Sequence, residues 1–388
     1  MPQPDTALLI LDMQRDLATP EGVRYHERTA SVIEPILRLR ELAREKNWPV
    51  LYTRNVHEPW AFDREIGGIP WCVRGTPGVE IIDPCKPDPG ETVIRKRTLD
   101  AFFGTELDSF LRRLGVKRLV LAGVFANEGV LITAGEAALR WYDLVLPVDA
   151  AAGRTDFDDE ATLREISFLY QGKLTTTEAL LAGREADVAA DTSVAPPEQV
   201  RKESVELPPA ETALIVVDMQ NDFARHGGAL FVPDTADTIE PIRSLLHEAR
   251  EKGATVVFTQ DWHRPDDAEF RIWPVHAVAG TPGAAVIDPL EARDDELRVK
   301  KLRYDAFYGT SLDHALRLNN VRNVVVTGTV SNICVLHTAG KAALHGYRVV
   351  VAEDGISSLD PFDQALALRQ VTEVFKGEVC GSAGVRLH

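Results

Sequence analysis

The sequence predicts an α/β protein made of two tandem Rossmann-like domains, each with three layers (α/β/α) and a mainly parallel sheet. The chain has 388 residues, enough for two domains of roughly 150 residues each. It also repeats itself at an offset of about 205 residues. Within each copy, short β-branched runs alternate with longer stretches of helical period, a pattern typical of parallel strands joined by helical crossovers.

The internal repeat is visible in three pairs of segments. They are TALLILDMQRDL from Thr6 and TALIVVDMQNDF from Thr212, GTPGVEIIDP from Gly75 and GTPGAAVIDP from Gly280, and DAFFGTELDSFLRRLGVKRLVLAGV from Asp100 and DAFYGTSLDHALRLNNVRNVVVTGT from Asp305. Residues 189–209 are rich in proline and charge and have no apolar period, which predicts a linker. The predicted domains are therefore 1–188 and 210–388.

The elements of the second copy follow one another in a regular order. Apolar β-branched runs predict strands at 213–218, 255–260, 323–328 and 348–353, and helical periodicity predicts helices at 238–253, 309–319 and 332–346. Ligands of such a sheet bind outside the carboxyl ends of its strands. Asp218 ends the first strand, Asp261 and His263 follow the second, and Cys334 follows the third. We therefore expect these side chains to converge on one rim.

Composition and charge narrow the choice of partners. The formal net charge of −16 repels a phosphate backbone and an anionic membrane, so we expect a small-molecule partner rather than nucleic acid or a membrane. The N-terminus has no basic residue before its short apolar stretch, which predicts a cytoplasmic location. Four cysteines are too few for a disulfide framework, so a functional cysteine is a nucleophile or a metal ligand.

Three residues of the second copy carry candidate chemistry. Cys334 comes after a strand and a short turn and opens a helix, where the helix dipole favours a thiolate, although a lone cysteine is more often buried and inert. Asp218 ends an apolar strand, where a carboxylate is partly desolvated; a helix cap or a buried acceptor is the alternative. Lys301, taken alone, is typical of a solvated surface lysine.

Together these residues resemble the isochorismatase-like cysteine hydrolase superfamily, which includes nicotinamidases and N-carbamoylsarcosine amidases. The similar motifs are VVDMQNDF, KLRYDAFYGTSL and GTVSNICVLHTAGKAAL, in that order. The resemblance implies that Cys334 is the nucleophile, Asp218 the general base and acid, and Lys301 the cation that orients Asp218 and favours the thiolate. It also implies a cis peptide before Val330 and an oxyanion hole formed by the amides of Val330 and Cys334.

A second group of residues indicates a divalent metal. The segment from 259 to 284 holds the candidate ligands Asp261, His263, Glu269 and His276, whose oxygen and imidazole donors suit zinc, iron or manganese. A polar surface loop is the plainer alternative. The segment resembles that of nicotinamidases, in which the metal holds the pyridine nitrogen, although Ala277 stands where many of those enzymes have cysteine. Two aromatic walls of a substrate pocket are expected from Phe223 and Trp262, with core packing as the alternative.

The first copy lacks most of these groups and is predicted to be degenerate. Gly129 stands opposite Cys334, and Asn55 and Trp71 stand opposite Asp261 and His276, although His57 is kept. Residual activity without a thiol is the minor alternative. Because members of the superfamily commonly form dimers, we expect an internal pseudo-dimer, and the resemblance leaves a further homo-oligomer open.

The leading hypothesis is a metal-assisted amidohydrolase that converts nicotinamide or a similar carboxamide to the acid and ammonia through a thioester. A rival in the same superfamily is a metal-free carbamoyl or ureido amidase, in which Arg303 would hold a substrate carboxylate. A non-catalytic ligand-binding scaffold is the alternative from a different class. Metal content separates the first two, and release of ammonia excludes the third.

Overall fold

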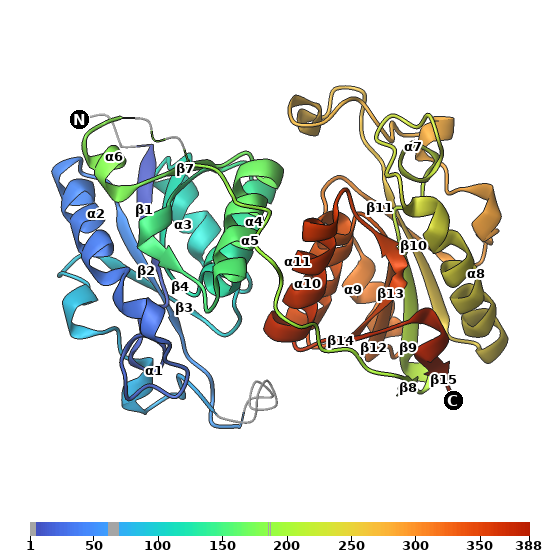
Figure 1. Cartoon of the computed structure of the whole chain (residues 1–388), viewed down its shortest axis with the longest axis horizontal. Coiled ribbons are helices and arrows are strands. Elements are labelled where there is room, and N and C mark those ends of the chain that lie inside the picture. The colour runs from blue at the N-terminus through green and yellow to red at the C-terminus, as the bar shows by residue number, and fades with distance from the viewer. Residues whose placement is uncertain (1–4, 61–69, 185, 187) are drawn as a thin grey trace. The chain divides into compact units, whose positions relative to one another are not determined.

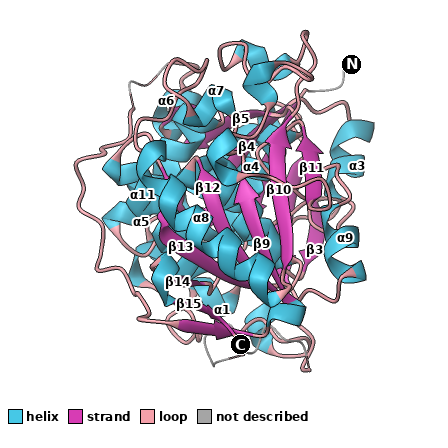
Figure 2. Cartoon of the chain, turned by 90° about the vertical axis from the view of Figure 1, so that its right-hand side faces the viewer, coloured by secondary structure: helices cyan, strands magenta, loops and turns pink. Residues whose placement is uncertain are grey.

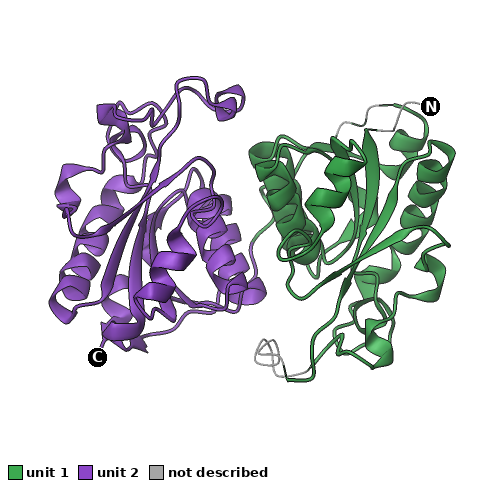
Figure 3. Cartoon of the chain, turned by 180° about the vertical axis from the view of Figure 1, so that it is seen from behind, with its two compact units in different colours: residues 1–195 green, residues 196–388 purple. Residues whose placement is uncertain are grey.

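The chain divides into two compact units, 1–195 and 196–388 (Figure 3). The computed structural model describes residues 5–60, 70–184, 186 and 188–388. The division lies within residues 189–209, which the sequence assigns to a linker. The end of that segment belongs to the second unit, because the strand β8 (Val205–Leu207) pairs in parallel with β15 (Val385–Leu387). Val205 and Leu207 are buried there, which explains why this part of the segment is ordered.

The first unit is built on a parallel sheet with the strand order β3-β2-β1-β4-β5-β7, and β6 pairs with β4. Its strands are β1 (Thr6–Leu11), β2 (Val50–Asn55), β3 (Thr92–Lys96), β4 (Arg118–Val124), β5 (Asp143–Pro147), β6 (Ala151–Ala152) and β7 (Lys173–Thr175). Its helices are α1 (Arg15–Ala18), α2 (Ile33–Glu45), α3 (Leu107–Arg113), α4 (Leu131–Leu139), α5 (Asp156–Arg164) and α6 (Thr177–Leu181).

The second unit repeats this design with the strand order β11-β10-β9-β12-β13-β14. Its main strands are β9 (Thr212–Val217), β10 (Thr255–Asp261), β11 (Leu297–Lys301), β12 (Asn323–Thr329), β13 (Arg348–Ser357) and β14 (Glu378–Cys380). Its helices are α7 (Asn221–Ala224), α8 (Thr235–Lys252), α9 (Leu312–Leu318), α10 (Leu336–Leu344) and α11 (Pro361–Arg369). The α8 helix covers one face of the sheet, and α9, α10 and α11 lie on the other (Figures 1 and 2). The predicted α/β class, with two domains and mainly parallel sheets, is confirmed.

The central strands are buried on both faces, and this explains the runs of apolar residues at their centres. Every residue of β9 and of β12 is buried. Gly328 lets these two strands approach closely, because a Cβ at this position would lie 2.0 Å from the carbonyl oxygen of Val217 and the residue has a φ of +114°. The pairing of β9 with β12 places their carboxyl ends side by side, at the edge where the site forms.

No described helix combines the length and the apolar character that a membrane span requires.

Candidate active site

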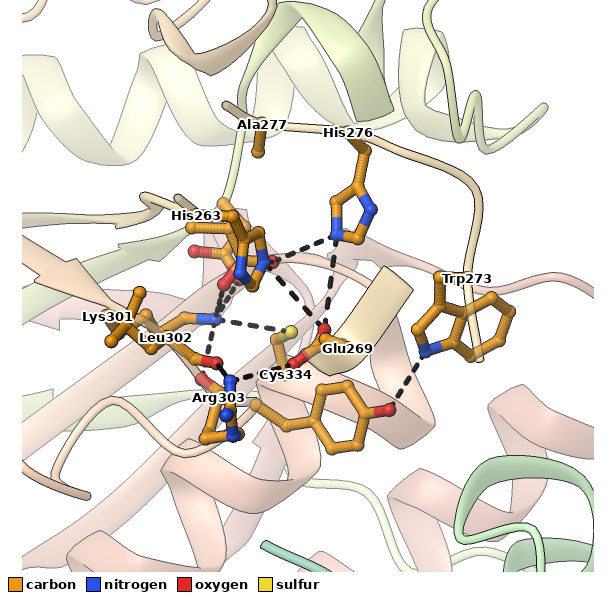
Figure 4. Close-up of polar contacts among 12 residues, drawn as sticks. His263, Glu269, Trp273, His276, Ala277, Lys301, Leu302, Arg303 and Cys334 are labelled. Carbon is orange, nitrogen blue, oxygen red and sulfur yellow. Dashed lines mark hydrogen bonds and ion pairs between the residues drawn. The ribbon is translucent and has the colours of Figure 1, made fainter. Parts of the chain in front are cut away.

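Three strand ends of the second unit bring Asp218, Lys301 and Cys334 together, as the sequence predicts. Asp218 follows β9, Lys301 ends β11, and Cys334 lies in the π-helical turn Ser331–Val335 between β12 and α10. Lys301 Nζ lies 2.7 Å from Asp218 Oδ2. It also lies 3.4 Å from Cys334 Sγ (Figure 4). All three side chains are buried. This arrangement places a thiol, a carboxylate and an ammonium within reach of proton transfer.

The backbone and a neighbouring strand hold Asp218 in place. Its φ is +49°, a conformation that is uncommon for a residue other than glycine. Thr259 on β10 donates a hydrogen bond to Asp218 Oδ1 at 2.6 Å, and its hydroxyl accepts one from the Asp218 amide at 3.2 Å. With Oδ1 engaged by Thr259, Oδ2 is the oxygen that faces Lys301.

Burial sets the protonation of the Cys334 thiol. It raises the pKa of Cys334 well above its usual value, and Asp218 and Asp261 raise it further, against the opposing effect of Lys301. Lys301 acts in the direction that favours a thiolate, but burial and the two carboxylates outweigh it. Lys301 is also shared between Asp218 and Asp261, because it bonds both. Burial likewise raises the pKa of Asp218, although Lys301 opposes this, so Asp218 is a stronger base than an exposed carboxylate.

The four predicted metal ligands form one buried group beside Lys301. One donor atom from each of Asp261, His263, Glu269 and His276 lies within 4.8 Å of the others. The Nε2 atoms of both histidines face the same two oxygens, Asp261 Oδ2 and Glu269 Oε1. His263 Nε2 lies 3.8 Å from each of these oxygens, and His276 Nε2 lies 4.0 Å from each. Two imidazole and two carboxylate donors around one point suit a borderline divalent ion such as zinc.

The Nδ1 atom of each histidine lies beside an oxygen. His276 Nδ1 lies 2.7 Å from the carbonyl oxygen of Pro274, and His263 Nδ1 lies 3.3 Å from Asp267 Oδ2. An acceptor at Nδ1 keeps the proton there, so Nε2 presents a lone pair. Among the described residues neither ring nitrogen of His263 has a hydrogen-bond partner of good geometry, so the approach of Asp267 to Nδ1 is an ion-pair contact. A buried imidazole whose Nε2 has no partner fits a metal-binding role better than it fits a plain polar loop.

The charges of this region also fit a divalent ion. The side chains of Asp218, Asp261, Asp267 and Glu269 are all buried, and the cations beside them are Lys301 and Arg303. With both histidines neutral, as metal ligands must be, four carboxylates against two cations leave a formal charge of −2, which one divalent ion would neutralise. Without it, burial and the Asp261 charge raise the pKa of Glu269 to about 8. Burial alone would raise the pKa of Asp261 too, but Lys301 and His263 outweigh it and hold that pKa well below its usual value.

A cavity of about 260 Å³ lies between the thiol and the metal-ligand group. Its walls are mostly apolar, and among the described residues that line it none is a lysine or an arginine. The lining residues are Asp218, Phe223, Ala229, Leu230, Phe231, Val232, Asp261, Glu269, Trp273, His276, Tyr304, Thr329, Val330, Ile333, Cys334 and Leu359. Phe223, Val330 and Cys334 are thus at the cavity, as predicted. The bond between Thr329 and Val330 is cis, as the resemblance implies.

Two predicted substrate contacts lie elsewhere. Trp262 does not line the cavity, and Lys300 Nζ lies 3.8 Å from its ring centre. Arg303 is turned toward the metal-ligand group, with Nη1 3.1 Å from Asp267 Oδ1 (Figure 4). The aromatic wall is instead made by Trp273, whose Nε1 donates to the hydroxyl of Tyr304 at 2.9 Å. Trp273 stands three residues before His276 in the segment that holds the metal ligands, and this proximity could have identified it as a wall of the cavity instead of Trp262.

The first unit keeps the carboxylate and the lysine of this site and lacks the thiol. Lys96 Nζ lies 2.7 Å from Asp12 Oδ2 and donates to Asn55 Oδ1 at 3.1 Å. Gly129 is at the position equivalent to Cys334. A Cβ on Gly129 would lie 2.6 Å from Asp12 Oδ2, so the carboxylate occupies space that a larger residue needs.

Charged residues of the first unit replace apolar walls of the second. In the repeat alignment, Arg24 stands opposite Leu230, Glu128 opposite Ile333 and Arg154 opposite Leu359. Arg24 Nη2 lies 3.0 Å and Arg154 Nε 3.4 Å from the same Glu128 oxygen. Each guanidinium also covers an aromatic ring, Arg24 that of Trp71 and Arg154 that of Phe125. An ion cluster therefore stands at positions that form the apolar cavity wall in the second unit.

Comparison with known proteins agrees with the repeated architecture. The family model of the isochorismatase domain matches residues 6–179 and 212–383. A ureidoacrylate amidohydrolase from Cronobacter sakazakii is 31% identical over 211 residues, 45% of this chain and 87% of the relative. The solved structure of N-carbamoylsarcosine amidase from Thermoplasma acidophilum is 38% identical and matches 44% of this chain and 96% of that chain, with a TM-score of 0.41. The structure of a nicotinamidase from Bacillus subtilis is 31% identical and matches 44% of this chain and 99% of that chain, with a TM-score of 0.42. Because the two matches span most of its length, the chain belongs to the isochorismatase family of hydrolases, with two domains of that family in tandem.

Proposed function

We propose that the second unit is a cysteine amidohydrolase that converts a small, neutral heteroaromatic carboxamide, such as nicotinamide, to the acid and ammonia. The observation that carries the proposal is the small apolar cavity with Cys334 on one side and a four-donor metal-ligand group on the other. Its volume of about 260 Å³ is below the roughly 300–1,000 Å³ of pockets for drug-sized ligands, so the substrate is small.

The catalytic steps use Cys334 and Asp218. Cys334 Sγ attacks the amide carbonyl carbon while the thiol proton passes to Asp218, and Asp218 then gives that proton to the amide nitrogen, which leaves as ammonia. A thioester remains on Cys334. Asp218 next accepts a proton from water, the hydroxide attacks the thioester carbonyl, and the thiol recovers its proton as the acid departs. The amides of Val330 and Cys334 are the proposed donors to the oxyanion, each worth about 3 kcal/mol of barrier.

Asp261, His263, Glu269 and His276 are the residues that would hold the metal ion. When bound, the ion would supply a Lewis acid that a ring nitrogen can ligate. Phe223 and Trp273 border the same cavity and would hold the flat ring between aromatic walls. These contacts would orient the carboxamide toward Cys334. Such positioning lowers the activation barrier of the attack.

The second candidate is a carbamoyl or ureido amidase, which the similarity to a ureidoacrylate amidohydrolase favours. A ureido acid carries a carboxylate, and a buried carboxylate needs a cationic partner. Arg303, the residue expected to fill that role, pairs with Asp267 and Glu269 instead. The cavity walls therefore support a neutral substrate better than an anionic one. A pure scaffold role for the second unit has no comparable support, because it would not need the Asp218–Lys301–Cys334 arrangement.

The experiment is an ammonia-release assay on the purified full-length protein together with elemental analysis. Nicotinamide, benzamide and a ureido acid are compared, since benzamide has the same shape as nicotinamide and lacks the ring nitrogen. We expect one divalent ion per chain, turnover of nicotinamide, and a loss of at least ~10²-fold in kcat/KM for benzamide. A metal-free protein that ignores nicotinamide and cleaves the ureido acid would overturn the proposal in favour of the second candidate.

A further inference from the structure

Asp267 touches two of the four proposed metal ligands without being one of them. Its Oδ2 lies 3.3 Å from His263 Nδ1, and its Oδ1 accepts a hydrogen bond of 3.0 Å from the backbone amide of Glu269. The second contact caps the short 3₁₀ turn Ala268–Arg271, which begins immediately after Asp267. One carboxylate with a buried side chain therefore lies against the ring of His263 and caps the turn that carries Glu269.

Arg303 holds Asp267 and Glu269 from the other side. Its Nη1 lies 3.1 Å from Asp267 Oδ1 and 3.6 Å from Glu269 Oε2. The arginine thus contacts one oxygen of Glu269, and the other, Oε1, faces the Nε2 atoms of His263 and His276. The side chains of Asp267 and Arg303 are only 6% and 16% exposed, so water screens this pair weakly.

The first unit shows that the turn after the lysine does not need an arginine to fold. Thr98 stands there opposite Arg303. The lysine of each unit nevertheless donates to the backbone carbonyl at this position, Lys96 to Thr98 at 3.0 Å and Lys301 to Arg303 at 3.1 Å. Because the backbone arrangement is the same, the Arg303 side chain serves something that the first unit lacks, and the first unit lacks the aspartate and the second histidine of the metal-ligand group.

We infer that Asp267 and Arg303 form a positioning pair for the metal site: Asp267 orients His263 for coordination through Nε2, and Arg303 holds Asp267 and the Oε2 atom of Glu269, which leaves Oε1 directed at the histidines. This inference rests on the proposed metal site and adds two residues to it. Outer carboxylates of this kind set ring orientation, and their removal costs about 10–100-fold in metal affinity. Arg303 is thereby assigned to the metal site.

The test is the dissociation constant of zinc, measured on the metal-stripped full-length protein by competition with a chromogenic chelator. Asp267→Asn and Arg303→Met keep side-chain volume and remove one charge each. The matched controls are Asp266→Asn and Arg264→Met, which break an exposed pair in the same loop. We expect zinc to bind about 10–100-fold more weakly to the first two variants and within 2-fold of wild type to the controls. The absorption spectrum of the cobalt-loaded protein should change only in the first two, because it reports ligand geometry.

A double-mutant cycle separates positioning from general loosening. Because Arg303 acts partly through Asp267, Asp267→Asn with Arg303→Met should lose less affinity than the two single losses combined. Arg303→Lys, which keeps the charge, should restore part of the affinity. Circular dichroism spectra that match wild type show that the variants are folded. Wild-type binding of one zinc with unchanged affinity in both variants would overturn the inference alone, whereas a wild-type protein that binds no divalent ion at these residues would overturn the metal site and the inference together.

Discussion

Asp261 belongs to the proposed catalytic group and to the metal-ligand group at once. Its Oδ1 bonds Lys301, and its Oδ2 faces the Nε2 atoms of His263 and His276. The motifs predicted these residues because parallel strands deliver their carboxyl ends to one edge. The motifs could not predict the orientation of the Trp262 and Arg303 side chains. Both residues lie in loops, where packing and ion pairs decide which way a side chain points.

Lys301 is the residue on which the buried charges depend most. Replacement by methionine leaves the carboxylates of Asp218 and Asp261 facing each other without a cation. We expect Lys301→Met to destabilise the second unit by about 3–5 kcal/mol, the usual cost of leaving a buried charge unpaired. Calorimetric unfolding measures the effect. Lys300→Met, which removes an exposed lysine next in the chain, should cost less than about 1 kcal/mol. Equal losses in the two variants would contradict the buried-pair account.

His276 should couple metal content to activity. His276→Ala removes one of the two imidazole donors and leaves the thiol, Asp218 and Lys301 in place. We expect the metal content to fall well below one ion per chain and kcat/KM for nicotinamide to fall at least ~100-fold. Elemental analysis and the ammonia assay measure both, and His314→Ala on the exposed side of α9 is the control. Full activity in a metal-free His276→Ala protein would separate catalysis from the metal.

Among the structural elements, the turn that follows the fourth strand of each sheet determines whether the unit has a nucleophilic thiol. In the second unit it is the π-helical turn Ser331–Val335, which presents Cys334. In the first it is Ala126–Val130, where Glu128 has a non-helical backbone (φ −103°, ψ −107°) and its side chain pairs with two arginines. The repeat pattern in the sequence showed that Gly129 replaces the thiol. It did not predict the arginine pairs, because their partners come from distant segments.

Restoring the thiol alone should not restore activity in the first unit. The Cβ of Gly129→Cys would lie 2.6 Å from Asp12 Oδ2, and Asp12 is held by Lys96 and Thr53. Asn55 and Trp71 also leave this unit without two of the four donors. We expect no ammonia release from the double variant Gly129→Cys with Cys334→Ala. Measurable turnover would show that the first unit keeps a working pocket.

The cluster around Glu128 should stabilise the first unit locally. Glu128→Gln keeps the shape of the side chain and removes the charge that Arg24 and Arg154 share. Because both arginines are partly exposed, we expect a modest local loss of about 1–2 kcal/mol. Hydrogen–deuterium exchange of peptides covering β4 and α4 reports it, with exposed Glu41→Gln as the control. Exchange unchanged from wild type would mean that the cluster contributes nothing to this unit.

At the scale of the whole molecule, a duplicated chain has kept one complete arrangement of the proposed catalytic residues. The fold class and the repeat were predictable because alternating strands and helices and a sequence offset of about 205 residues are properties of the chain itself. The placement of the two units as an internal pseudo-dimer stays a prediction. So does the role of the first unit, which we propose to be structural rather than catalytic.

If one thiol per chain performs the chemistry, the rate of ammonia release by Cys334→Ala must show it. The assay compares the full-length variant with wild type and with Cys380→Ala, which removes another buried thiol of the same unit. We expect turnover below detection in Cys334→Ala and a near-normal rate in Cys380→Ala, because only Cys334 lies beside both Asp218 and Lys301 among the described cysteines. Sustained ammonia release by Cys334→Ala would contradict it.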